Sequence, residues 1–158
     1  MNKRNLVYIF SVIGVEIVGF IGTFFTTPSI NGWYVTLLKP SFNPPNWIFG
    51  PVWTFLFLLI GLSLAKVLLS PKDNLNRSKA LMAYVIQLTL NVGWSFVFFY
   101  LHKPGLAVGE IIILIIAIAT NIYYASKVKR SAAILLVPYL LWVSFATILN
   151  IAIWQLNR

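Results

Sequence analysis

The sequence predicts an all-α integral membrane protein, built as one bundle of five transmembrane helices. Of its 158 residues, 59% are hydrophobic and only 9% are charged, and the mean hydropathy is +0.86. Soluble domains usually carry about 25% charged residues. Five apolar segments are long enough to cross a bilayer, which takes about 20 residues. Because little chain remains outside them, residues 1–158 are expected to form a single domain.

Short polar or proline-containing breaks separate the five segments. The expected spans, in chain order, are 6–25, 47–69, 80–101, 106–126 and 132–156. The first span follows a basic start and so resembles a signal peptide. It contains Glu16 and lacks a small-residue cleavage site, so we interpret it as a span. No internal repeat is visible.

Basic residues lie mainly on one side of the predicted bundle. Nine of the twelve occur at the N-terminus and in the second–third and fourth–fifth connections: Lys3, Arg4, Lys66, Lys72, Arg77, Lys79, Lys127, Lys129 and Arg130. Only Lys39, Lys103 and Arg158 fall on the other side. The positive-inside rule then places the N-terminus in the cytoplasm and the C-terminus outside, most simply in a bacterial cytoplasmic membrane. The net charge of +9 therefore reports topology, and no nucleic-acid partner is expected.

Composition also narrows the chemistry. Without cysteine, the chain has no thiolate metal site, and its single histidine, His102, makes a histidine metal site unexpected. Neither a nucleophile–base pair nor a phosphate-binding loop is visible. We expect no metal, no intrinsic cofactor and no conventional enzyme active site.

The stretch from residue 33 to residue 53 is the most distinctive part of the chain. It holds four of the eight prolines and three of the six tryptophans. Each proline fixes its own φ and favours an extended predecessor, so the first half is expected to be non-helical. We interpret it as a rigid extracytoplasmic lid between the first two helices.

Polar and aromatic residues share faces of three predicted helices. On the third span, one helix face holds Gln87, Asn91, Trp94, Ser95 and Phe98. On the second span, a shared face holds Trp53, Phe57 and Gly61. On the fifth span, the corresponding face holds Pro138, Trp142, Ala146, Leu149 and Asn150. Such rings can be plain core packing, and Trp33, Tyr34, Trp47, Tyr100 and Trp154 can be a membrane-interface belt. Trp53, Trp94 and Trp142 lie inside spans, where aromatic walls suit a large, planar, mostly apolar ligand.

Two acidic residues, Glu16 and Glu110, lie within predicted spans. An ionisable group at that depth is a functional candidate, here for proton coupling. The alternative is a protonated carboxyl, or one that reaches the membrane surface.

Three motifs resemble the translocator protein family (TspO/MBR, the peripheral-type benzodiazepine receptor and tryptophan-rich sensory proteins). The first is Trp33-Tyr34-x4-Lys39-Pro40-Ser41-x2-Pro44-Pro45-x-Trp47-x2-Gly50-Pro51-Val52-Trp53-Thr54. The others are Gln87-Leu88-x-Leu90-Asn91-x2-Trp94 and Pro138-Tyr139-Leu140-x-Trp142-x2-Phe145-Ala146-x3-Asn150. Together they cover nearly the whole chain.

The resemblance implies a five-helix bundle, often a homodimer, that binds porphyrins and sterol-like or drug-like molecules beneath the first loop. It places ligand contacts at Tyr34, Pro44, Trp53, Asn91, Trp94, Trp142 and Ala146. It also links Trp53 and Trp142 to light- and oxygen-dependent degradation of protoporphyrin. Two departures are Phe42, where the family usually has Trp, and Ile151 with Gln155, where the animal cholesterol motif needs Tyr and a base.

These observations favour a membrane receptor or sensor for tetrapyrroles. Trp53, Trp94, Trp142 and Phe98 would form its walls, Asn91 and Gln87 would orient polar edges, and Tyr34 would close the top. The alternative is a porphyrin transporter with proton coupling at Glu16 or Glu110. A regulator that reports its ligand to a partner protein stays open as a third hypothesis.

Overall fold

The computed structural model describes residues 2–158 and confirms the predicted fold class. Within that range five helices are long and apolar enough to cross a membrane. They are α1 (Lys3–Ile30), α3 (Asn46–Leu68), α4 (Leu75–Ser95) with its π-helical extension η1 (Phe96–Tyr100), α5 (Pro104–Val128) and α6 (Arg130–Leu156). The protein is therefore an integral, multi-pass membrane protein.

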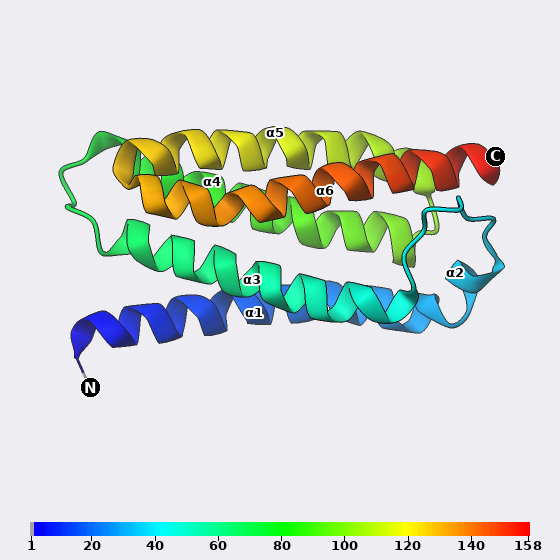
Figure 1. Cartoon of the computed structure of the whole chain (residues 1–158), viewed down its shortest axis with the longest axis horizontal. Helices are drawn as coiled ribbons and strands as arrows, with labels where there is room; N and C mark the ends of the chain where they lie inside the picture. The colour runs from blue at the N-terminus through cyan, green and yellow to red at the C-terminus, as the bar shows by residue number, and fades with distance from the viewer. Residues whose placement is uncertain (1) are drawn as a thin grey trace.

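The five long helices lie side by side and close into a ring (Figure 1). Helix α1 packs on α3, α3 on α6, α6 on α5, and α5 on α4, while α4 and η1 return to α1. The two termini lie at opposite ends of the bundle, as an odd number of spans requires (Figure 1). The spatial order places α1, α3, α4 and α6 around the central space where the site is found.

Several helices extend beyond the apolar segments that predicted them. Helix α1 begins at Lys3, where the Asn2 side chain accepts a hydrogen bond from the Arg4 amide at 3.2 Å, and it continues through Pro28 to Ile30. Asn74 caps α4 in the same way, accepting from the Asn76 amide at 2.9 Å. Capping side chains satisfy helix-end amides that a hydropathy pattern does not register.

The structure corrects the prediction that the first half of the proline-rich stretch is non-helical. Residues Trp33–Thr36 form a short helix, α2. The prolines of this stretch begin only at Pro40, so the amides of α2 are free to bond, and the Leu37 amide donates to the Tyr34 carbonyl at 3.4 Å. The chain from Leu37 to Pro45 is non-helical, as predicted.

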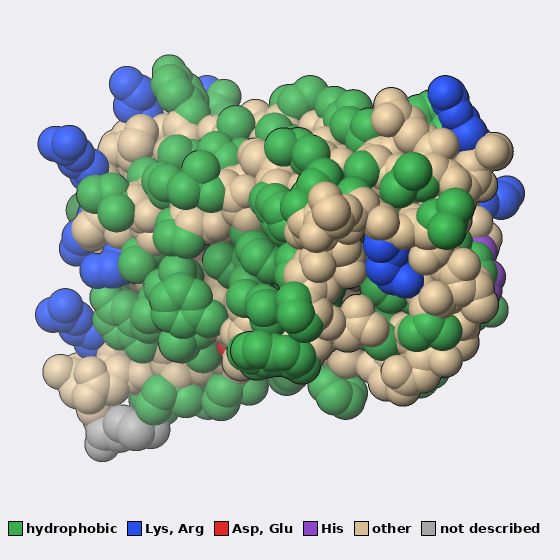
Figure 2. All heavy atoms as spheres, turned by 45° about the vertical axis from the view of Figure 1, so that its right-hand side comes forward, with side chains coloured by type: hydrophobic (Ala, Val, Ile, Leu, Met, Phe, Trp, Pro, Cys, Tyr) green, Lys and Arg blue, Asp and Glu red, His purple; other side chains and the backbone are tan. Residues whose placement is uncertain are grey.

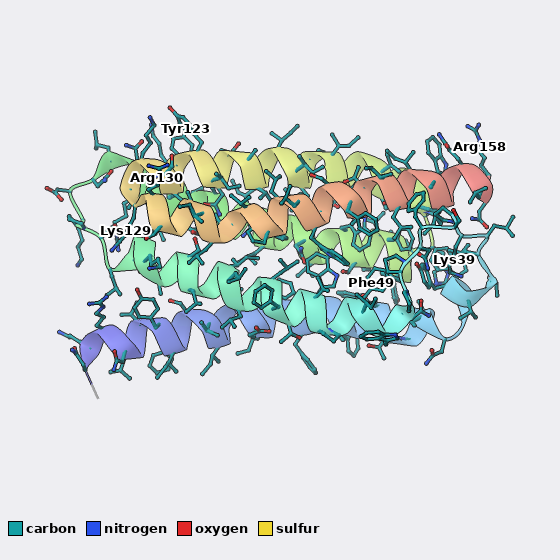
Figure 3. The ribbon with its side chains drawn as sticks, in the orientation of Figure 1. Lys39, Phe49, Tyr123, Lys129, Arg130 and Arg158 are labelled. Carbon is teal, nitrogen blue, oxygen red and sulfur yellow. The ribbon has the colours of Figure 1, made fainter. Side chains whose placement is uncertain are left out.

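Charged and apolar side chains are distributed as a membrane requires. Figure 2 shows one face of the molecule, with hydrophobic side chains over its middle and basic side chains toward its two ends. Figure 3 labels Lys129 and Arg130 at one end, and Lys39 and Arg158 at the end that holds α2 and the C-terminus. We call these the basic end and the lid end.

Candidate functional site: a cavity beneath the lid

A cavity of about 850 Å³ occupies the lid-end half of the bundle. Side chains from α1, α3, α4 with η1, and α6 line it, and Tyr34 of α2 closes its top. None of the lining residues comes from α5. A cavity of this size falls within the range of small-molecule sites.

Aromatic rings from three helices line this cavity. Trp53 stacks on Phe57 with ring centres 5.6 Å apart, and Trp94 stacks on Phe98 at 5.2 Å. Phe49 meets Trp142 edge-on at 6.0 Å, and Figure 3 shows Phe49 between α3 and α6. The three tryptophans predicted from the spans, Trp53, Trp94 and Trp142, therefore share one cavity. Stacked and edge-on contacts of this kind stabilise the rings in these positions.

The polar groups of the cavity are largely held by the protein itself. The Asn91 amide donates to the Tyr139 hydroxyl at 2.9 Å. The Trp94 indole donates to Asn150 at 3.0 Å, and Asn150 donates to the Pro104 carbonyl at 2.9 Å. By contrast, the indole N–H of Trp142 has no hydrogen-bond partner among the residues described.

The lid, residues 33–45, is organised around Tyr34. Its ring is only 4% exposed and its hydroxyl donates to the Asn43 side chain at 2.9 Å. The Lys39 ammonium lies 4.7 Å from the ring centre. Burial raises the pKa of Tyr34 to about 12 against the opposing effect of the Asn43 hydrogen bond. The hydroxyl is therefore neutral at physiological pH and keeps its donor.

The C-terminus fastens the lid. Asn157 accepts a hydrogen bond from the Leu38 amide at 2.9 Å and donates to the Leu38 carbonyl at 2.8 Å. It also donates to the Ile153 carbonyl at 2.7 Å, which fixes its orientation on α6. One side chain thus binds both backbone groups of a lid residue.

The cavity opens sideways between α1 and α3. The two helices touch where an added Cβ at Gly61 would lie 2.6 Å from the Val12 backbone, and where Gly19 lies against the Phe57 ring. Gly50 of α3, nearer the lid, also lines the cavity, and a Cβ added there would meet nothing within 4 Å. Two lining residues beside this gap, Phe20 and Trp47, are 75% and 74% exposed. In a membrane this opening faces lipid.

Most of the predicted ligand-binding residues come together in this cavity. They are Tyr34, Trp53, Asn91, Trp94, Phe98, Trp142 and Ala146. Pro44 does not line it, and its carbonyl instead accepts a hydrogen bond from Asn43 at 3.0 Å. Gln87 lies deeper on α4, fully buried and outside the lining, and its amide has no partner within residues 2–158. Pro138, predicted to share a face with Trp142, is exposed.

The two membrane acids lie in different places. Glu16 is half-buried and lines the cavity on its α1 side. Glu110 lies outside the lining, facing Gly93 of α4, and both its oxygens are buried without a hydrogen-bond partner among the described residues. Within that same range no cluster of three potential metal ligands occurs.

Sequence reasoning missed the contribution of α1. Three threonines of this helix, Thr23, Thr26 and Thr27, line the cavity together with Glu16 and Phe20. Their spacing of three and four residues on an otherwise apolar span was a visible signal, because such positions share one helix face. Phe49 was also missed, since it lies beside the prolines that dominated the pattern.

Comparison with known proteins places these features in a family context. The chain matches the family model described as "TspO/MBR family" over residues 11–155. It is 43% identical to "Tryptophan-rich protein TspO" of Chlorobaculum tepidum over 157 residues, which cover 99% of each chain. A protein of the same name from Archaeoglobus fulgidus is also 43% identical over 157 residues, with 99% of each chain covered. The human "Translocator protein" is 34% identical over 142 residues, which cover 88% of this chain and 83% of that protein.

Proposed function

The chain belongs to the TspO/MBR family, and we propose that it is a membrane receptor or sensor that captures a tetrapyrrole beneath its lid. The proposal covers protoporphyrin IX, haem-like rings and other flat hydrophobic molecules of sterol-like or drug-like character. One observation carries it: three tryptophans from three helices line a single cavity of about 850 Å³. Flat aromatic walls with few polar groups favour a large planar ligand.

The cavity offers different contacts at different depths. Trp53, Trp94 and Trp142 supply faces and edges for stacking, while Asn91 and the unpartnered indole N–H of Trp142 supply polar groups. Tyr34 covers the ligand from the lid end. We propose that Ala146, the small lining residue of α6, leaves room for the ring between α6 and α4.

Any chemistry on the bound ring would be photochemical. Indole is an oxidisable ring, so Trp53 or Trp142 would donate one electron to a photo-excited porphyrin, which would pass it to dioxygen to form superoxide. The indole radical left behind would then take an electron back from the porphyrin, so that the net flow of electrons is from porphyrin to dioxygen. The porphyrin is the ligand on which the protein acts, and no further cofactor enters this proposal.

The test is a titration of the purified protein with protoporphyrin IX, followed by tryptophan fluorescence and porphyrin absorbance. We expect Trp53→Phe and Trp142→Phe each to weaken binding by about tenfold, as loss of roughly 1.4 kcal/mol of ring contact would. Illumination in air should then degrade the porphyrin more slowly in both variants.

Trp154→Phe is the matched control, because Trp154 is on the same helix as Trp142, α6, but lies outside the cavity lining. Its binding curve should equal that of the unmodified protein. If the titration curves of Trp53→Phe and Trp142→Phe were both unchanged, these residues would not be part of the binding site and the proposal would be wrong.

Transport is the second candidate function, and the position of Glu16 favours it. A carboxyl that lines a cavity open to lipid can bind and release a proton as cargo moves. Porphyrin uptake into liposomes that needs both a pH gradient and Glu16 would support transport. Tight binding without flux would support the receptor.

We further propose that the protein lies in a cytoplasmic membrane with its basic end facing the cytoplasm. The nine-to-three division of basic residues supports this orientation. Association into a homodimer stays a prediction from the family.

A further inference from the structure

We propose that the α1–α3 side of the cavity is a second subsite, in which Glu16 and the rings of Phe57 and Trp53 receive the positively charged head of a basic amphiphile from the bilayer. It uses the same cavity as the proposed function and deepens it by naming a second ligand class. It does not depend on protoporphyrin being the first.

The charge of the cavity lining favours a cationic ligand. Among the residues that line the cavity, Glu16 is the single acid, and lysine, arginine and histidine are all missing from that lining. A carboxylate in the hydrocarbon layer is costly unless it is paired. Since the lining supplies no cation, a ligand that brings one would provide the partner that this carboxylate lacks within the lining.

The position of Glu16 on α1 places it on the side of that helix that packs against α3. Glu16 stands four residues after Val12 and three before Gly19 on α1. These two neighbours contact Gly61 and Phe57 of α3. Residues three and four apart share a helix face, so the Glu16 carboxyl lies on the α3 side at the level of Phe57.

The aromatic surroundings match this charge. Trp53 stacks on Phe57 at 5.6 Å, and both rings line the cavity with Glu16. The faces of aromatic rings attract cations, most strongly ammonium groups that have lost their water. A carboxylate that lines the same cavity as these rings therefore favours an amine or quaternary ammonium over a neutral group of equal size.

The subsite is distant from the lid. Glu16 and Ile30 are both lining residues, and they are fourteen positions apart on α1, which corresponds to about 21 Å along a helix. A ring beneath Tyr34 and a charged head at Glu16 would therefore occupy separate parts of the cavity. The acidic side chains of a porphyrin should point away from Glu16, because like charges repel.

The ligand should enter from the membrane. Ile13, Ile17 and Phe20 are exposed beside Glu16 and line the same opening. An amphiphile in the bilayer can thus place its head at Glu16 while its tail stays against these side chains.

The experiment compares two probes that differ only in charge. Phenylbutyltrimethylammonium carries a permanent positive charge, and its carbon isostere has a tert-butyl group in place of the trimethylammonium. Both are titrated calorimetrically into the protein in maltoside micelles, with empty micelles as the blank. We expect the unmodified protein to bind the cation at least about tenfold more tightly, and Glu16→Gln to bind the two probes equally.

Glu110→Gln is the matched control, because Glu110 is the other acid within a span but lies outside the cavity lining. It should keep the preference for the cation. Equal affinities in the unmodified protein, or a preference that survives Glu16→Gln, would overturn the inference.

Protoporphyrin titration of the same variants separates this inference from the proposed function. Glu110→Gln, outside the cavity lining, should bind protoporphyrin as the unmodified protein does. If protoporphyrin does not bind at all while the cation preference depends on Glu16, the proposed function fails and the subsite stands.

Discussion

Asn157 shows how much of the lid depends on single side chains. Its side chain hydrogen-bonds to both the amide and the carbonyl of Leu38. The Tyr34 hydroxyl donates a hydrogen bond to Asn43, and the Lys39 ammonium lies over the Tyr34 ring. These bonds join the C-terminal end of α6 to a loop more than a hundred residues earlier in the chain. Because the lid has little regular structure of its own, such bonds decide how tightly it covers the cavity.

We expect Asn157→Ala to loosen the lid without unfolding the bundle. Each lost hydrogen bond contributes about 0.5–1.5 kcal/mol net, and the exposed Leu38 groups can bond to water instead. Hydrogen exchange measured by mass spectrometry should become faster in residues 37–43 and stay unchanged in the body of α6. Dissociation of protoporphyrin should also become a few-fold faster.

Arg158→Ala is the control for this prediction, because the Arg158 guanidinium lies 5.9 Å from the centre of the Trp154 ring, which belongs to α6 and not to the lid. In this variant, the amide hydrogens of the lid should exchange at the same rate as in the unmodified protein. If Asn157→Ala also left exchange at residues 37–43 unchanged, Asn157 would not fasten the lid.

At the scale of elements, α1 and α3 pack closely beside the lateral opening of the cavity. Small residues allow two membrane helices to approach closely. Gly19 and Gly61 provide this approach, because a Cβ at Gly19 would collide with the Phe57 ring and a Cβ at Gly61 with the Val12 backbone. The packing of α1 on α3 therefore depends on these two glycines.

Gly61→Ala should destabilise the bundle. Its methyl group would lie 2.6 Å from the Val12 Cα, and the backbone there cannot yield as a flexible side chain can. Overpacking of this kind costs about 1–3 kcal/mol, so the thermal unfolding midpoint in maltoside should fall.

Gly109→Ala provides the comparison. Gly109 is also in a helix interior, but an added Cβ there would meet nothing within 4 Å. Alanine is the better helix former by about 1 kcal/mol, so this variant should be as stable as the parent or more so. Equal midpoints for the two variants would contradict the close contact at Gly61.

The sequence predicted the type of every long element but not the local exceptions. Hydropathy identifies spans because a helix in lipid must be long and apolar. The turn at α2 and the π-helical extension at Phe96–Tyr100 leave no such signal. The same limit applies to the site: regular spacing placed Asn91 and Trp94 correctly, whereas Gln87 shares their face but lies too deep to reach the cavity.

For the whole molecule, the distribution of charge indicates the orientation in the membrane, which the packing of the helices does not. The helical ring has no direction of its own, and either end could face the cytoplasm. The basic end holds Lys129 and Arg130, and the lid end holds Lys39 and Arg158 (Figure 3). The direction in which the lid faces therefore depends on the positive-inside rule applied to all twelve basic residues.

Cysteine labelling can test this orientation cleanly, because the natural chain contains no cysteine. Ser41 in the lid and Asp73 between α3 and α4 are both exposed and lie outside the helices. We expect Ser41→Cys to react with a membrane-impermeant maleimide in intact cells, because the proposed orientation places the lid outside. Asp73→Cys should react only after the membrane is permeabilised. The reverse pattern would place the lid in the cytoplasm, so that ligands could reach the cavity through the lid only from the cytoplasmic side.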